Sequence, residues 1–189
     1  MDIPKFLFHY YDLEKGPFRN ITEHGYEKAA NIQGKITEGL NSKRPKNYLS
    51  LRFSLEKRIR EQFILKGGKP NRKDPFYFTL GECEFAKSWY VTPGVIKIPL
   101  NDFKEDSISF SYPDSMVSYQ FHDEPKLEAY RKQCNGKIFL LNEIHSVIKE
   151  YGLPSEKKSQ AEESYKYDKY IEAQVWDDQI IKKYKTKAS

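Results

Sequence analysis

Short runs in which apolar and polar residues alternate recur along the chain, and they constrain its fold more than any other feature. The runs at 95–100 (VIKIPL) and 107–112 (SISFSY) alternate as half-buried strands do. We expect further strands at 5–11, 48–53, 76–80, 137–141 and 170–176. Expected helices at 27–36, 55–66, 84–90, 143–151 and 154–168 separate these strands. This order predicts a mixed α+β architecture with a mainly antiparallel sheet and flanking helices, in preference to a doubly wound parallel sheet.

One helix of this set has clear signals at both of its ends. Ser54 is expected to cap the helix at 55–66, and Gly67 and Gly68 end it. Leu55, Ile59 and Phe63 recur every four residues and form one apolar stripe on it. The run at 48–53 just before it reads as a strand, although it also fits an earlier start of the same helix.

The core of the protein is expected to be rich in aromatic side chains. Only 38% of the 189 residues are hydrophobic and 31% are charged, yet the chain has 14 Tyr, 12 Phe and 2 Trp. Each buried ring removes about 150–250 Å² from water, which argues against a disordered chain. The length predicts one domain over residues 1–189, with a basic tail at 182–189 that frays.

Several classes of protein are excluded by the sequence. No apolar run approaches the roughly 18 residues that a membrane span needs, and the amino terminus lacks the pattern of a signal peptide. Cys83 and Cys134 are too few for a disulfide scaffold. No second His or Cys lies at ligand spacing from His122, so we expect no metal site. We therefore expect a protein of the cytoplasm, of the producing or of a target cell, without a membrane partner.

The net charge of +5 is distributed unevenly. Residues 44–73 contain ten basic side chains against Glu56 and Glu61, a local charge of +8. The tail adds +4, which leaves −7 for the rest of the chain. A concentration of positive charge predicts an anionic ligand, either nucleic acid or a nucleotide diphosphate, while a solvated basic helix face is the alternative. The candidates for contacting nucleic acid are Lys57, Arg58, Arg60, Lys69, Arg72 and Lys73.

Three groups of residues are candidates for chemistry, and each also has a structural interpretation. His9 lies within an apolar strand, where either the core or a ligand must satisfy its ring nitrogens. Glu172 lies in mid-strand on the same face as Tyr170 and Gln174, and it faces either solvent or a cleft. Tyr77 and Tyr90 either pack in the core or hold a planar ring between them.

Taken in order, these residues resemble the His-Tyr-Glu group of ADP-ribosyltransferases. His9 in FHYYD matches the first element, Tyr77 in FYFTL with Tyr90 after it the second, and Glu172 in YIEAQVW the third. In that family the histidine holds the adenine ribose and the nicotinamide amide of NAD. The tyrosines stack on the nicotinamide, and the glutamate bonds the 2′-hydroxyl of the nicotinamide ribose. The opening segment and the basic stretch also resemble small toxin or anti-phage members, some of which modify nucleic acids.

The resemblance implies a fold in which the sheet forms an NAD-binding cleft, with no metal. It implies that Glu172 is catalytic, and that His9, Tyr77 and Glu172 line one cleft. The chain would be a glycosyltransferase that moves ADP-ribose from NAD to a macromolecule, DNA or RNA being favoured over protein, with a cognate inhibitor or antitoxin as a further partner. The residues that would bind NAD are His9, Tyr10, Arg52, Tyr77, Thr79 and Tyr90, with Arg52 foremost at the pyrophosphate.

Two rival functions follow from the same residues. A non-catalytic nucleic-acid-binding module would use the basic segment on phosphates and exposed aromatic rings on bases. A metal-independent ribonuclease would use His9 or His122 with a lysine. Turnover of NAD distinguishes the transferase from both rivals.

Overall fold

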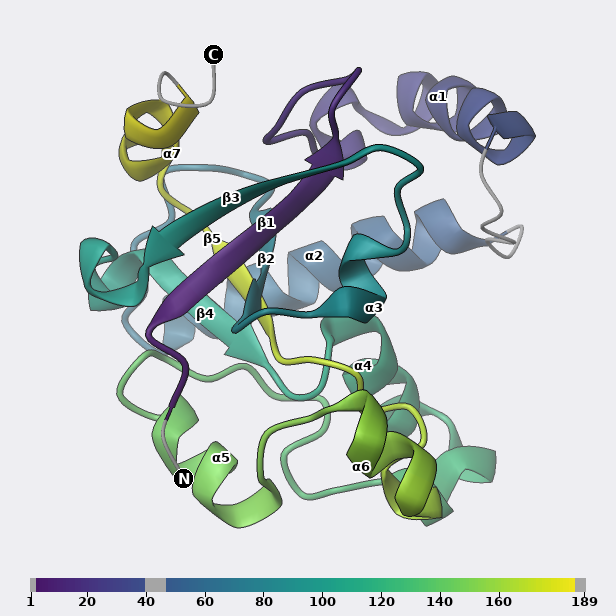
Figure 1. The fold of residues 1–189 in the computed structure, drawn as a ribbon, viewed down its shortest axis with the longest axis vertical. Coiled ribbons are helices and arrows are strands. Elements are labelled where there is room, and N and C mark those ends of the chain that lie inside the picture. Colours follow the sequence, from purple (N-terminus) through teal and green to yellow (C-terminus); the bar gives the residue numbers. More distant parts are fainter. Residues whose placement is uncertain (1–2, 40–46, 186–189) are drawn as a thin grey trace.

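Five strands form one sheet in the order β3-β1-β2-β5-β4, and every neighbouring pair is antiparallel (Figure 1). The computed structural model describes residues 3–39 and 47–185. The single-domain α+β class and the antiparallel sheet expected from the sequence are confirmed. The strands are β1 (Phe6–Asp12), β2 (Phe76–Leu80), β3 (Pro93–Pro99), β4 (Ile108–Ser111) and β5 (Glu172–Val175).

Helices surround the sheet and connect its strands (Figure 1). The α-helices are α1 (Tyr26–Gly39), α2 (Tyr48–Leu65), α3 (Glu84–Lys87), α4 (Ser115–Asp123), α5 (Ile144–Tyr151), α6 (Glu156–Ala161) and α7 (Asp178–Lys185). Shorter 3-10 turns are η1 (Ile21–His24), η2 (Leu100–Asp102), η3 (Glu105–Ser107), η4 (Pro125–Tyr130) and η5 (Glu163–Tyr165). Within the described residues, no helix is long and apolar enough to cross a membrane.

The two faces of the sheet differ in character because side chains alternate along each strand. On one face, Leu7, Phe78, Phe110 and Ala173 belong to the main hydrophobic core. On the other face, the register aligns Phe8 with Thr79, Thr79 with Glu172 and Glu172 with Ser111. The polar face therefore carries Glu172 in the middle of a row that crosses four strands.

Helix α2 packs over this polar face. Its predicted apolar stripe is confirmed, since Leu55, Ile59 and Phe63 are all buried in a second cluster with Trp176. The rings of Phe63 and Trp176 stack with centroids 5.7 Å apart, and the indole N–H of Trp176 donates to Ser109 Oγ at 2.9 Å. The hydrophobic half of α2 thus fixes the position of its polar half above the sheet.

Two of the expected strands are wrong. Residues 48–53 form the first turns of α2, because Leu49 and Arg52 are buried at the same helical spacing as Leu55. Ser54 is therefore inside the helix and does not cap it. Residues 137–141 contribute only an isolated bridge, between Phe139 and Phe110.

The basic tail is ordered as far as the structure describes it. Residues 182–185 belong to α7 rather than fraying, because Tyr184 and Lys183 donate to Asp102 Oδ2 at 2.6 and 2.8 Å. Residues 186–189 of the expected tail lie outside the described residues.

Candidate active site

Glu172 is held on the polar face of the sheet by hydrogen bonds from its neighbours. Its side chain is 5% exposed, and Oε1 accepts a hydrogen bond from Gln174 Nε2 at 2.9 Å. Gln174 is fixed in turn, since it also donates to Ser111 Oγ at 3.0 Å and accepts from Ser109 Oγ at 2.8 Å. These buried polar contacts orient the carboxylate of Glu172 before any ligand binds.

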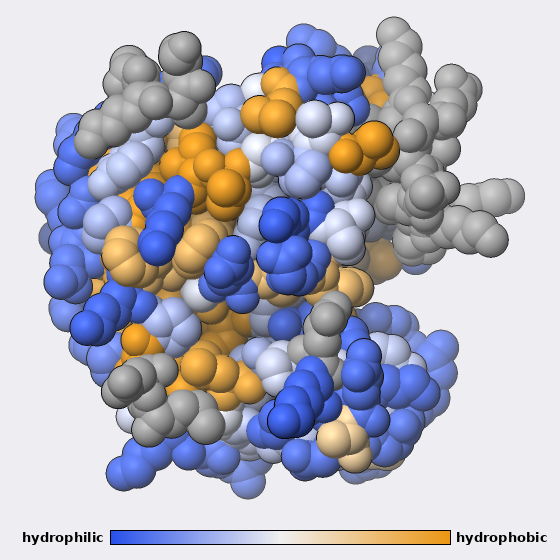
Figure 2. All heavy atoms as spheres, in the orientation of Figure 1, coloured by the Kyte–Doolittle hydropathy of each residue, from blue (hydrophilic) through white to orange (hydrophobic). Residues whose placement is uncertain are grey.

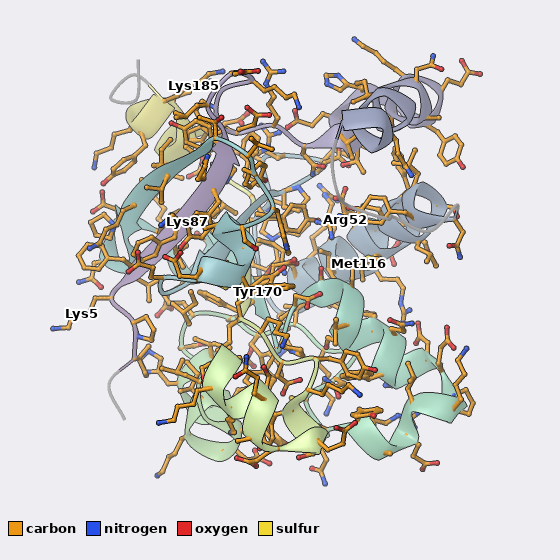
Figure 3. All side chains as sticks on the ribbon, turned by 45° about the vertical axis from the view of Figure 1, so that its right-hand side comes forward. Lys5, Arg52, Lys87, Met116, Tyr170 and Lys185 are labelled. Atoms are coloured by element: carbon orange, nitrogen blue, oxygen red, sulfur yellow. The ribbon has the colours of Figure 1, made fainter. Side chains whose placement is uncertain are left out.

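Arg52 reaches the same face from α2. Its guanidinium carbon lies 3.7 Å from the centre of the Tyr77 ring, and its Nε donates to Glu56 Oε1 at 3.1 Å. Arg52 is 7% exposed, and its charge interacts with that of Glu172. Figure 3 shows Arg52 and Tyr170 together near the centre of the molecule, beside Met116 of α4.

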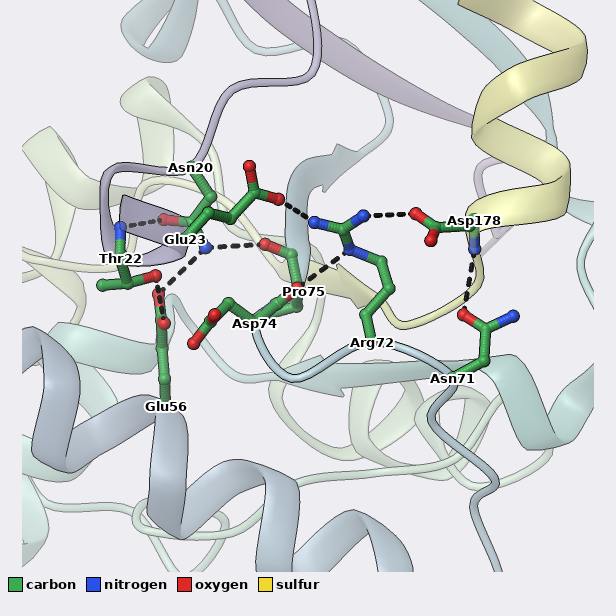
Figure 4. A network of polar contacts seen from close by, with 9 residues as sticks. All are labelled: Asn20, Thr22, Glu23, Glu56, Asn71, Arg72, Asp74, Pro75 and Asp178. Carbon is green, nitrogen blue, oxygen red and sulfur yellow. Dashed lines mark hydrogen bonds and ion pairs between the residues drawn. The ribbon is translucent and has the colours of Figure 1, made fainter. Parts of the chain in front are cut away.

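Glu56 anchors this arrangement. Beyond Arg52, it accepts a hydrogen bond from the hydroxyl of Tyr77 at 2.7 Å. Figure 4 shows two more, from Thr22 Oγ1 at 2.6 Å and from Asn20 Nδ2 at 3.2 Å. Four donors, from α2, β2 and the segment at η1, therefore converge on one buried carboxylate. With its oxygens engaged in this way, Glu56 positions Arg52 and Tyr77 and is not available for a ligand.

A second carboxylate borders Glu172. Asp114 begins α4, is 7% exposed, and has its pKa raised to about 7 by burial and by the charge of Glu172. Tyr170 lies beside both acids, and its pKa is raised well above the usual value by burial and then by Asp114 and Glu172. We refer to Arg52, Tyr77, Asp114, Tyr170 and Glu172 as the Glu172 cluster.

The charge of the Glu172 cluster is its main chemical property. The guanidinium of Arg52 already bonds Glu56, so it does not by itself balance Glu172 and Asp114 as well. Buried carboxylates without full compensation favour a cation next to them. The cluster is therefore suited to a positively charged ligand or transition state.

Comparisons with known proteins add no relative: no family model, no curated protein and no solved structure matches this chain.

The structure brings together several of the residues that the sequence assigned to NAD. Tyr77 and Arg52 belong to the cluster, and Thr79 lies next to Glu172 in the register. The hydroxyl of Thr79, however, donates to the carbonyl of Gly81 at 2.7 Å. One face of the Tyr77 ring is covered by Arg52, so stacking on a ligand is limited to what that contact leaves open.

His9 lies on the opposite face of the sheet. Its Nδ1 bonds the carbonyl of Tyr77 at 2.9 Å, and its Nε2 accepts the N–H of Phe18 at 2.9 Å. Phe18 and Phe78 pack against the ring, at 4.7 and 5.1 Å, and burial lowers the pKa of His9 to about 4. This corrects the expectation that His9, Tyr77 and Glu172 line one cleft: His9 is a neutral histidine of the apolar face.

Tyr10 and Tyr90 belong to a small cluster under α3. The hydroxyl of Tyr10 accepts the N–H of Cys83 at 2.8 Å, which fixes the start of α3. Tyr90 packs against this cluster, as Tyr170 does. The pairing of Tyr77 with Tyr90 around one planar ring stays a prediction, whereas Tyr170 links the cluster under α3 to Glu172.

Four basic side chains of the segment are paired with acids that are distant in the sequence, while Arg44 and Lys46 lie outside the described residues. Arg58 bonds Asp123, Lys69 lies 3.2 Å from Asp106, and Lys66 lies 2.7 Å from Glu143. The chain therefore neutralises much of its +8 segment internally, which favours the solvated-face interpretation over a continuous nucleic-acid surface.

The remaining candidates for nucleic-acid contact follow the same trend. Arg72 bonds both Glu23 and Asp178, and so connects η1 to α7 (Figure 4). Arg60 donates to the carbonyl of Arg72 at 3.3 Å. Lys57 is 79% exposed and only 4.0 Å from Glu61, and Lys73 is exposed beside Asp74. Lys57, Lys69 and Lys73 are thus the exposed cations of the set, and of these Lys69 is paired with a distant acid.

Space for a ligand adjoins the Glu172 cluster. A pocket of about 310 Å³ is lined by Tyr170 together with Phe6, Phe8, Lys5 and Lys169. Figure 2 shows a notch in the right-hand outline of the molecule, between the regions of α2 and α4 in Figure 1. A second pocket, of about 640 Å³, lies at α7 and includes Arg72, apart from Glu172.

The described residues contain no group of three or more His, Cys, Asp or Glu side chains that could hold a metal ion. Sequence reasoning missed Asp114 and Glu56. The Pro-Asp-Ser segment at 113–115 is a signal for a helix start, and it could have drawn attention to Asp114. Glu56 lies four residues after Arg52, a spacing that pairs them only once 48–53 is recognised as helix.

Proposed function

We propose that this protein is an ADP-ribosyltransferase that uses NAD, with Glu172 as its catalytic carboxylate. The observation that carries the proposal is the placement of Glu172, a buried carboxylate that Gln174 orients. Its cluster contains two carboxyl groups, those of Glu172 and Asp114, but only the one guanidinium of Arg52. NAD has a positively charged nicotinamide ring, and its cleavage develops positive charge on the ribose. A fixed carboxylate stabilises such charge most in a site from which water is excluded.

The residues of the cluster have separate roles in this reaction. The bond from ribose C1′ to the nicotinamide nitrogen breaks, and its electron pair leaves with neutral nicotinamide. Glu172 accepts a hydrogen bond from the ribose 2′-hydroxyl and offsets the positive charge on C1′. Arg52 bonds Glu56 through Nε, and its two terminal nitrogens make no hydrogen bond to the described residues, so we assign them to the pyrophosphate.

The proposed acceptor is a macromolecule, with nucleic acid tested first. Lys57 and Lys73 support this choice as accessible cations of the basic segment. The ion pairs of Arg58, Lys69 and Arg72 weaken it, because paired cations add little to phosphate binding. Protein therefore belongs among the acceptors of the experiment. His9 is not available as a catalytic group for the ribonuclease alternative, because both of its ring nitrogens bond the backbone.

The experiment is incubation with NAD labelled in the adenylate part, in the presence of DNA, RNA or protein. We expect release of nicotinamide and transfer of label to one acceptor class. Glu172→Gln should abolish both, because the amide keeps the shape of the side chain but not its charge. Glu105→Gln, at an exposed glutamate outside the site, is the matched control and should retain activity. A folded preparation that releases no nicotinamide with any acceptor would contradict the proposal.

A further inference from the structure

We propose that Asp114 is a second functional carboxylate of the Glu172 cluster, and that it accepts the proton that the acceptor loses as it attacks C1′ of the ribose. This inference rests on the proposed function, since it names the base for the same transfer.

The backbone holds Asp114 next to Glu172. Ser111 is opposite Glu172 in the register of β4 and β5, and the carbonyl of Pro113 accepts the N–H of Glu172 at 3.0 Å. The chain then turns directly into α4, where Asp114 Oδ1 accepts the N–H of Val117 at 3.0 Å. Among the described residues Oδ2 has no hydrogen-bond partner. The cap therefore uses one oxygen of Asp114 and leaves the other for a proton.

The surroundings of Asp114 differ from those of an ordinary helix cap. A carboxylate at a helix amino terminus is usually held in its charged form by the helix dipole. Here burial and the charge of Glu172 from β5 raise the pKa of Asp114 to about 7, and the Val117 N–H and Arg52 of α2 oppose them. Asp168 adds a weaker repulsion, but it is paired with Lys132 at 2.9 Å, and Tyr170 is uncharged near neutral pH.

In the proposed reaction Glu172 and Asp114 have different roles. Glu172 is the carboxylate proposed to offset the positive charge of the ribose, so the proton of the acceptor is assigned to a second group. In the step proposed, an O–H or N–H of the acceptor forms the new bond to C1′ while the bond to nicotinamide breaks. Nicotinamide leaves with the electron pair, and the acceptor proton passes to Asp114 Oδ2, which becomes a neutral carboxyl. A base that titrates near neutral pH is suited to this task.

The test is Asp114→Asn, which preserves the cap because Asn is as good as Asp at that position. We expect NAD to bind as in the wild type, while the rate of transfer falls on the order of 10²–10³-fold. The wild-type rate should rise with pH through neutrality, and this rise should be absent in the variant. Asp123→Asn, at the other end of α4, is the matched control and should keep the wild-type rate and pH profile.

A second measurement is independent of turnover. The carboxyl carbon of Asp114, followed by ¹³C NMR, should titrate well above the usual range of aspartate, and Glu172→Gln should lower its midpoint. An ordinary aspartate titration, or an Asp114→Asn variant with wild-type rate and pH profile, overturns the role of Asp114. If the Asp114 measurements give these contrary results while Glu172→Gln still abolishes turnover, the role of Asp114 is wrong and the proposed function stands. Absence of any turnover by the wild type overturns both.

Discussion

Arg52 and Tyr77 come from a helix and a strand that are 25 positions apart, yet the guanidinium carbon lies 3.7 Å from the centre of the ring. Both side chains also bond the same oxygen of Glu56, at 3.1 and 2.7 Å. The contact between helix and sheet is therefore polar at the cluster and apolar further along α2. Glu56 is the group on which the geometry of the site depends.

Removing Glu56 should destabilise the protein strongly. Glu56→Ala leaves Arg52 buried without its partner, and we expect a loss of about 3–5 kcal/mol in the free energy of unfolding. Urea denaturation at pH 7 measures this. Glu61→Ala on the same helix, where the side chain is 59% exposed, should change stability by less than about 0.5 kcal/mol. Equal effects of the two variants would contradict the anchoring role.

His9 should make stability depend on pH in the acid range. Its pKa is lowered from 6.5 to about 4 by burial, so between these values the unfolded chain binds a proton that the folded protein does not. Stability is therefore lost as the pH falls through this window, by up to about 3 kcal/mol. His9→Gln should be less stable at pH 7 but lack this dependence, as measured by denaturation at several pH values. His145→Gln, on an exposed position of α5, should behave as the wild type.

Asp114 should act on stability in the opposite direction. Its pKa is raised in the folded protein, so the folded state keeps a proton that the unfolded chain has released. This contribution is full at low pH and is lost as the pH rises to about 7. We expect Asp114→Asn at pH 8 to be more stable than the wild type, by on the order of 2 kcal/mol. The measured quantity is the stability of Asp114→Asn minus that of the wild type. A smaller difference at pH 8 than at pH 5 would argue against this prediction.

Arg72 should secure α7 rather than bind nucleic acid. Its guanidinium bonds Glu23 and Asp178 and lies 3.8 Å from the centre of the Phe76 ring. Arg72→Ala should cost about 2–4 kcal/mol and increase hydrogen exchange in α7, because two carboxylates lose their partner. Lys57→Ala, at an exposed lysine, should leave both unchanged. Weaker DNA or RNA binding by folded Arg72→Ala, without faster exchange in α7, would contradict this interpretation.

Much of the sheet follows from local sequence. The alternation in 76–80, 95–100 and 107–112 predicts three strands that the structure contains, and it places Tyr170, Glu172 and Gln174 on one face. Residues 48–53 alternate as well, but a run of six residues fits both the period of two of a strand and the period of 3.6 of a helix. Burial of Arg52 against Tyr77 makes this run helical. Local patterning cannot decide such a run, because the deciding contacts are distant in the sequence.

The sequence by itself determined that this chain has an aromatic core and an antiparallel α+β fold, because these depend on composition and on period-two alternation. It predicted a mid-strand position for Glu172, whereas β5 begins at that residue. Only the tertiary structure decided that His9 faces away from Glu172, since the pairing of Phe8 with Thr79 sets which faces coincide and a shift of one residue would reverse it. The tertiary structure also decided which basic side chains of the +8 segment are paired with acids. Charges counted along a chain cannot tell which of them will meet, and here Arg58 and Arg72 are neutralised by Asp123 and Asp178 from segments far along the sequence.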